Sequence, residues 1–144
     1  MDNMDEKDRK IIEMLEEDAR RSFTEIAKNI SVSEATVRKR VEKLEKRGII
    51  EGYTTDVNPE SLGYNTIALL GLDVEPENLL EAAETIGKMD EVKSAATCTG
   101  DHMIMAEIWA KDNRHLGEIM SEKIGSIEGV KNLRPAIVME EIKG

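Results

Sequence analysis

Cationic side chains gather in one short stretch of an otherwise acidic chain. Between Ser33 and Arg47 there are six Lys and Arg residues against three Glu residues, a local charge of +3, whereas the whole chain carries −10. Such a surplus favours a phosphate-bearing partner, because phosphate is the common polyanion that attracts clustered cations. On charge alone, a solvated helix face laced with Glu and Lys is the more frequent explanation. The stretch therefore needs a structural context before it indicates a binding site.

The surrounding residues supply that context, because they predict two short helices joined by a tight turn. Ser22 is expected to cap the first helix, with Glu25 reaching back to it, and this helix should stop near Ile30. Ser33 is expected to cap the second helix, whose inner face carries an apolar stripe of Val37, Val41 and Leu44. A small residue, Ala27, stands where the two helices should cross. Helix pairs of this kind place one helix in the DNA major groove.

The outer side of the second helix is then free to contact DNA. It carries Glu34, Ala35, Arg38, Lys39 and Glu42, opposite the apolar stripe. Arg38 is the candidate for a base contact, because a guanidinium can pair bidentately with guanine.

The first 63 residues complete a small helical domain and a connection. Asp5–Asp18 predicts one more helix, capped by Asp5, and Gly48 should end the last of the three. Ile49–Val57 is rich in β-forming residues and should be extended, and NPESLG at Asn58–Gly63 has turn chemistry. We therefore expect a helix-turn-helix domain at residues 1–50, an extended strand and linker at 51–63, and a second domain at 64–144.

The second domain alternates strand and helix signals in the order βαββαβ. The run Ile86–Lys93 recurs as Ile124–Lys131, and each copy ends a helix and opens a strand. Two βαβ units in tandem predict a ferredoxin-like sheet of four antiparallel strands with both helices on one face. The expected strands are 65–74, 92–99, 103–110 and 130–142, and the expected helices are 77–89 and 113–127. The fold class is α+β.

The other face of that sheet has no helix to cover it. If Ile67, Leu69, Ile104 and Ile108 lie there, a single copy exposes a large apolar patch, which suggests pairing with a second copy.

Composition excludes several classes of protein. Residues 64–144 hold 8 Lys and Arg against 15 Asp and Glu, so DNA should repel this half and the first half must face DNA.

A charged N-terminus and the lack of a long apolar run argue against secretion or a membrane, and Cys98 has no disulfide partner. We expect a cytoplasmic protein. His102 and His115 share no ligand spacing with Cys98, and no catalytic motif is present, so neither a metal site nor an enzyme is expected.

Two segments carry a family resemblance. The first is the opening run, MDEKDRKIIEMLEEDARRSFTEIAKNISVSEATVRKRVEKLEKRGIIEGYTTDVNPESLGY, and the second is TGDH at Thr99–His102, between two expected strands. Over essentially its full length the chain resembles the leucine-responsive regulator / asparagine-regulator (Lrp/AsnC, feast/famine) family of transcription factors.

The resemblance implies a repressor or activator that binds double-stranded DNA. A hinge would join its DNA-binding domain to an effector domain, which dimerises through its sheet and often assembles into octamers. The effector would be an amino acid or a related metabolite. The residues implied at the groove are Ser33, Thr36, Arg38 and Lys39, with Arg40 and Lys43 as candidates for phosphate. The residues implied at the effector are Thr99, Gly100, Asp101 and His102.

One departure from the family pattern concerns the effector. Family members commonly carry an acidic residue two positions after the TGD aspartate, where it suits an ammonium group, and this chain has Met103 there. We expect no cofactor and leave the effector open.

Two alternative functions remain. One is an architectural DNA-binding protein without effector control. The other is an enzyme resembling the sirohaem decarboxylases, although Arg114 and Arg134 are few cations for binding an anionic tetrapyrrole.

Overall fold

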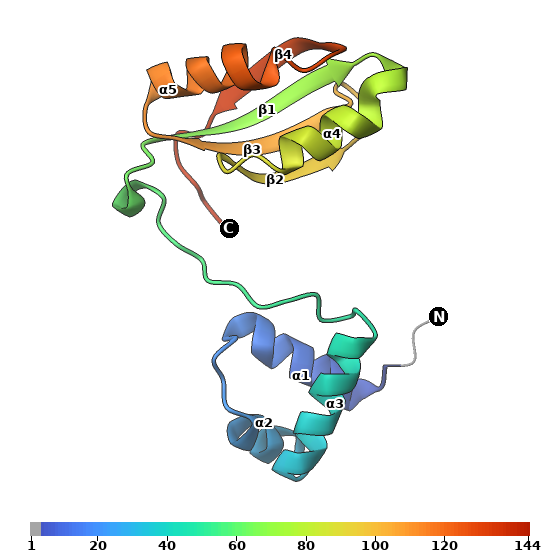
Figure 1. The fold of residues 1–144 in the computed structure, drawn as a ribbon. Helices are drawn as coiled ribbons and strands as arrows, with labels where there is room; N and C mark the ends of the chain where they lie inside the picture. The colour runs from blue at the N-terminus through green and yellow to red at the C-terminus, as the bar shows by residue number, and fades with distance from the viewer. Residues whose placement is uncertain (1–3) are drawn as a thin grey trace. The chain divides into compact units, whose positions relative to one another are not determined.

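The computed structural model describes residues 4–144, which divide into two compact units, one ending at Asp56 and one spanning Val57–Gly144 (Figure 1). The first unit is helical, and the second combines a sheet with helices. The finer division expected from the sequence, with a separate linker at 51–63, remains a prediction.

Capping residues define the three helices of the first unit, α1 (Glu6–Glu17), α2 (Phe23–Ile30) and α3 (Glu34–Lys46). Asp5 caps α1 and exchanges hydrogen bonds with Asp8 in a capping box. The Ser22 hydroxyl accepts from the backbone N–H of Glu25 at 3.1 Å, and Ser33 caps α3. The predicted caps are therefore confirmed. Gly48, with φ +72°, follows the end of α3 in the left-handed conformation that glycine adopts without strain.

Two details of this unit differ from the expectation. The Glu25 carboxylate does not close a capping box; its Oε2 lies 3.9 Å from Arg21 Nε. Residues 51–58 form no strand, because a strand requires a hydrogen-bonded neighbour and none of the described residues supplies one.

The three helices bury one apolar cluster. The side chains in this cluster come from all three helices, so each helix depends on the other two. They are Ile11, Met14, Leu15, Ile26, Ala27, Val37 and Val41. Each large side chain among them stabilises the unit by about 1.5–3 kcal/mol relative to exposure. This cluster fixes α3 by its inner face.

The second unit is a four-stranded antiparallel sheet in the order β2-β3-β1-β4. Its strands are β1 (Thr66–Val74), β2 (Val92–Thr97), β3 (Ile104–Ala110) and β4 (Val130–Ile137). Its helices are α4 (Leu79–Gly87) and α5 (Asn113–Glu118), and α5 continues into a π-helical turn, Ile119–Ile124. Short 3₁₀ turns precede β1 and α4, at Glu60–Leu62 and Pro76–Asn78. The βαββαβ ferredoxin-like order is confirmed.

The last strand ends at Ile137, earlier than the predicted residue 142. Ile137 pairs with Ala68 of β1, and the backbone N–H of Val138 donates to Ile67 at 2.8 Å. Because β1 begins at Thr66, almost no partner strand remains beyond this point.

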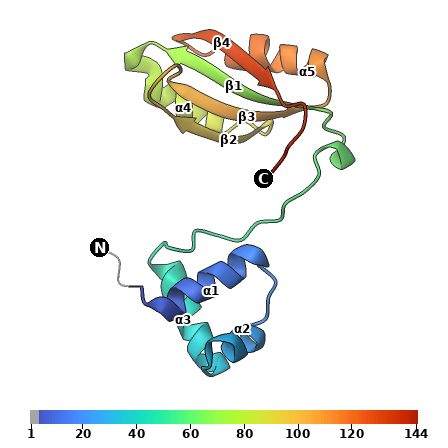
Figure 2. The same ribbon diagram turned by 180° about the vertical axis from the view of Figure 1, so that it is seen from behind.

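Both helices cover the same face of the sheet, which Figure 2 shows from the other side. The buried side chains beneath them alternate along the two central strands and include Ala68, Leu70, Leu72, Ile104, Ala106 and Ile108. The prediction that Ile104 and Ile108 lie on the uncovered face is therefore wrong. Ile67 and Leu69 do lie on that face, and because strand residues alternate between faces, Met105 and Trp109 lie there in place of Ile104 and Ile108.

Candidate nucleic-acid interface and effector loop

Helix α3 has one buried side and one exposed side. Val37, Val41 and Leu44 are almost completely buried, at 0%, 2% and 1% exposure. Arg38 and Lys39, which follow Val37 around the helix, are exposed, as is Lys43. The same amphipathic pattern that packs α3 therefore presents its cations outward.

The first turn of α3 presents two hydroxyl groups. Ser33 Oγ accepts from the backbone N–H of Thr36 at 3.1 Å and lies 2.9 Å from Thr36 Oγ1. Both predicted residues therefore sit at a helix N-terminus, where backbone N–H groups and the helix dipole favour an anion such as phosphate.

Arg38 is held in place by neighbours on two helices. Its Nη2 donates to Glu34 Oε1 at 2.7 Å, and its guanidinium lies 5.8 Å from the centre of the Phe23 ring. The other Glu34 oxygen accepts from Thr24 Oγ1 of α2 at 3.2 Å. A side chain fixed in this way loses less conformational entropy when it binds a target.

Arg40 is engaged within the protein. Its Nη1 donates to both carboxylate oxygens of Asp5, at 2.9 and 2.8 Å, and to Asp8 Oδ1 at 3.0 Å. The pKa of Asp5 lies below its ordinary value, first because the backbone N–H of Asp8 donates to the carboxylate and then because of Arg40. Hydrogen bonds from the same two carboxylates raise the pKa of Arg40. The geometry therefore uses this cation to join α3 to the start of α1.

Lys39 and Lys43 differ from Arg40. Within residues 4–144 neither forms an ion pair, and both side chains are exposed. They are available to an external phosphate without breaking an internal contact.

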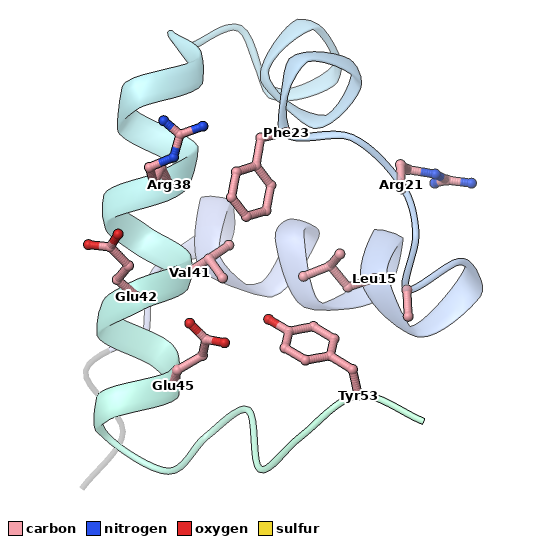
Figure 3. Close-up of a pocket in the computed structure, with 9 residues that line it drawn as sticks. Leu15, Arg21, Phe23, Arg38, Val41, Glu42, Glu45 and Tyr53 are labelled. Carbon is pink, nitrogen blue, oxygen red and sulfur yellow. The ribbon is translucent and has the colours of Figure 1, made fainter. Parts of the chain in front are cut away.

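A cavity of about 400 Å³ lies along one side of α3 and includes Arg38 in its lining (Figure 3). Leu15, Phe23 and Val41 supply apolar walls, and Tyr53 closes one side with its hydroxyl turned toward Glu45. Partial burial raises the pKa of Tyr53, and Glu45 adds to the shift by its charge and by a hydrogen bond.

The effector motif forms a closed loop between β2 and β3. The backbone N–H of Cys98 donates to Met103 at 2.8 Å, and that of Met103 donates to Leu72 of β1 at 3.1 Å. Gly100 has φ +104°, which only glycine adopts readily. Thr99, Gly100 and Asp101 are exposed at the tip.

His102 lies apart from the loop tip, against the sheet. Its ring rests on Gly71 of β1 so closely that a Cβ on Gly71 would lie 2.3 Å from His102 Cδ2. Among the described residues, His102 Nδ1 is the buried side-chain polar atom without a hydrogen-bond partner. The structure thus brings three of the predicted effector residues to one exposed tip and places the fourth beneath them.

Two features of these sites were missed from the sequence. Arg40 lies 35 positions from Asp5 and 32 positions from Asp8 in the sequence, and no local spacing predicts pairs so far apart. Gly71 carried a usable signal, because a glycine inside an apolar strand often marks the close approach of another group.

Comparison with known proteins agrees on both units. Residues 4–45 match the AsnC-type helix-turn-helix domain, and residues 67–144 match the Lrp/AsnC ligand binding domain. Within the described residues, no helix has the length and apolar character needed to cross a membrane.

Relatives extend over the whole chain. The HTH-type transcriptional regulator LrpA of Pyrococcus horikoshii is 50% identical over 140 residues, which cover 97% of this chain and 99% of that one. LrpA1 of Halobacterium salinarum is 40% identical over 93% of this chain and 94% of its own. The structure of E. coli AsnC has a TM-score of 0.87 at 30% identity and covers 98% of this chain and 95% of that chain. A Neisseria meningitidis regulator in complex with L-Met shares the fold, with a TM-score of 0.90 at 24% identity, over 99% of this chain and 94% of its own.

The two matched domains define a transcriptional regulator that binds DNA through a helix-turn-helix and carries a ligand-binding domain, not an enzyme. The chain belongs to the Lrp/AsnC family.

Proposed function

We propose that this regulator recognises a specific DNA sequence with α3 in the major groove. Arg38 reads a base edge, Lys39 and Lys43 bind phosphates, and Ser33 and Thr36 approach the backbone at the helix N-terminus. The observation that carries the proposal is the outward face of α3, where Arg38, Lys39 and Lys43 are exposed while the opposite face is buried.

Arg40 has a different part in this proposal. Because it already binds Asp5 and Asp8, contacting phosphate would break three hydrogen bonds. We assign it to holding α1 on α3, so it positions the reading helix and does not touch DNA.

Selection of binding sites from random duplex DNA tests the proposal. Two-fold pairing of subunits predicts a pseudo-palindrome whose half-sites are separated by about 10 base pairs or a multiple of that spacing. An architectural DNA-binding protein would instead yield no enriched sequence and would bind unrelated duplexes equally, with one salt slope.

The uncovered sheet face supports a homodimer. Leu69 is 43% exposed and Met105 is 37% exposed, and with Ala96 they border a hollow of about 230 Å³ on this face. A second copy meeting the same surface would bury these side chains and pair two recognition helices. Sizing in solution tests whether such dimers assemble further into an octamer, as the family resemblance implies.

The loop at Thr99–His102 is the proposed effector site. It combines the open backbone of Gly100, the exposed carboxylate of Asp101 and the partnerless Nδ1 of His102. Such groups suit a small polar metabolite, an amino acid or a relative of one, and the matched ligand-binding domain supports this assignment.

Thermal-shift screening of the amino acids tests the effector site, because a ligand that binds the native state raises its stability. Asp101→Ala should remove the response to any hit and leave DNA affinity without ligand unchanged. A full response from this variant would place the effector elsewhere.

A further inference from the structure

The cavity beside α3 has an apolar interior and two aromatic walls. Figure 3 shows the Phe23 and Tyr53 rings on opposite sides of it. Leu15 and Val41 supply the surface between the rings. The volume of about 400 Å³ lies within the range of roughly 300–1,000 Å³ that small-molecule sites occupy. These walls therefore suit a flat apolar group.

The walls differ in how firmly the fold holds them. Leu15 and Val41 belong to the buried cluster of the helical unit, and Phe23 packs against that cluster. Tyr53 comes from the segment after α3 and is 50% exposed, so it borders the cavity without being part of the core. One wall can therefore be altered without unfolding the helices.

The charged groups of the lining favour an anion at one end of the cavity. The guanidinium of Arg38 lies 5.8 Å from the centre of the Phe23 ring, so it borders the space between the two rings. Arg21 and Glu42 turn their charged ends away from that space, as Figure 3 shows. The Glu45 carboxylate accepts a hydrogen bond from the phenol on the opposite side. An anion with an apolar body can thus place its charge at Arg38.

We propose that this cavity binds an aromatic carboxylate, whose ring lies between Phe23 and Tyr53 and whose carboxylate pairs with Arg38. The ligand replaces Glu34, which is about half exposed and therefore holds Arg38 only weakly. A planar guanidinium suits this ligand, because it binds a carboxylate through two parallel hydrogen bonds.

The ligand and DNA then compete for one side chain. Arg38 is exposed on the face of α3 that we propose reads DNA, so a ligand that pairs with it lowers the affinity for the target duplex. By linkage, DNA lowers the affinity for the ligand by the same factor. This coupling rests on the proposed function, whereas binding of the ligand by itself does not.

The fluorescent aromatic carboxylate 2-naphthoate is the probe, excited outside the absorption band of the single tryptophan, Trp109. We expect full-length protein without DNA to change the emission of the probe in a saturable way. The neutral isostere 2-naphthamide should bind about two- to fivefold more weakly, the range for an exposed ion pair. No saturable change, or equal binding of the two compounds, would overturn the proposal.

Two variants of Tyr53 test the aromatic wall. Tyr53→Phe keeps the ring and should bind 2-naphthoate as the wild type does. Tyr53→Ala removes the ring and should bind it about tenfold more weakly. Because this side chain is half exposed, both variants should unfold near the wild-type temperature. Unchanged binding by Tyr53→Ala, or an equal loss in both variants, would contradict the proposed position of the ring.

Arg38→Gln separates the ion pair from the apolar contact. The affinity for 2-naphthoate should fall about two- to fivefold, whereas the affinity for 2-naphthamide should stay the same, because only the carboxylate loses its partner. A loss by the same factor for both compounds would mean that Arg38 does not bind the carboxylate.

Titrations of DNA with and without 2-naphthoate test the coupling. At a probe concentration that saturates the wild type, its affinity for the target duplex should fall, and the affinity of Tyr53→Ala should fall less. If the probe bound in the absence of DNA but left DNA affinity unchanged, the ligand site would stand and its coupling to DNA would be overturned.

Discussion

Arg38 donates a 2.7 Å hydrogen bond to Glu34, one turn earlier on α3. Both side chains are about half exposed, so water weakens the attraction between them. The pair therefore orients Arg38 but is weak enough to be broken, so a base edge or a phosphate can replace Glu34 as the partner of Arg38. The same glutamate adds a negative charge to the surface that we propose faces DNA.

Replacing that glutamate should loosen recognition and strengthen general binding. We expect Glu34→Ala to raise affinity for random duplex DNA, because an anion leaves the DNA-facing surface. The ratio of target to random affinity should fall, because Arg38 is no longer oriented. Titrations of both duplexes at several salt concentrations measure this ratio. Glu84→Ala, at an exposed position of α4 in the other unit, is the control.

The contact between Asp5 and Arg40 predicts how the helical unit responds to acid. The pKa of Asp5 in the folded chain is below its ordinary value of 3.8, so folding favours the ionised carboxylate. Its contribution to stability is present above pH 3.8 and is lost as the pH falls through the folded-state value. Asp5→Asn keeps a good helix cap but removes the charge. Thermal unfolding followed by helical circular dichroism should show a lower melting temperature at neutral pH and a shallower decline in acid.

The control for this change is Asp56→Asn, at an exposed position near the end of the same unit. It should follow the wild-type acid dependence. If Asp5→Asn also followed it, the pairing with Arg40 would contribute nothing to folding.

Gly71 and His102 form a packed pair whose loss can be measured. A Cβ at residue 71 would lie 2.3 Å from His102 Cδ2, so Gly71→Ala must displace the imidazole. We expect a loss of about 1–3 kcal/mol in the free energy of unfolding, typical of overpacking. Adding His102→Ala should restore most of that loss, and the two changes should be non-additive in denaturant titrations. Additive effects would mean that the contact is not strained by the methyl group.

The contrast between Gly48 and Gly71 shows what the sequence could predict. Helix ends follow local rules, so Ser22, Ser33 and Gly48 located the helices within a residue or two. The βαββαβ order likewise followed from the internal repeat and from local apolar patterns. Gly71 inside an apolar strand indicated that some group approaches the backbone there, but the identity of that group, His102, depends on how a loop folds back on the strand.

Strand faces were harder to predict than strands. Alternation alone does not say which set of residues meets the helices, so Ile104 and Ile108 were placed on the wrong side. The packing of β3 against α4 and α5 decides it, because the more apolar set provides the core. At the DNA site, the exposed positions of Arg38 and Lys39 were predicted from helix geometry. The pairing of Arg40 was not, because Asp5 and Asp8 lie on another helix.

The uncovered face predicts a change of oligomeric state. Leu69→Glu places a charge at its centre, which would be buried without a partner in a paired sheet. We expect a monomer by light scattering coupled to size exclusion. Affinity for a two-half-site duplex should fall by about 10²-fold or more, because the second half-site no longer binds intramolecularly.

Leu80→Glu is the matched control for that variant, because Leu80 is 72% exposed but lies on α4, away from the uncovered face. It should leave size and DNA affinity unchanged. If Leu69→Glu kept the wild-type size, the sheet face would not be the interface.

The central claim is that the exposed face of α3 reads DNA, and paired titrations of Arg38→Ala and Lys39→Ala test it most directly. On the selected duplex, Arg38→Ala should lose about 1–3 kcal/mol of binding free energy and should lose much less on random DNA. Lys39→Ala should weaken both duplexes equally and lower the salt slope by about one. Wild-type affinity for the selected duplex in both variants would contradict the claim and place the DNA on another surface.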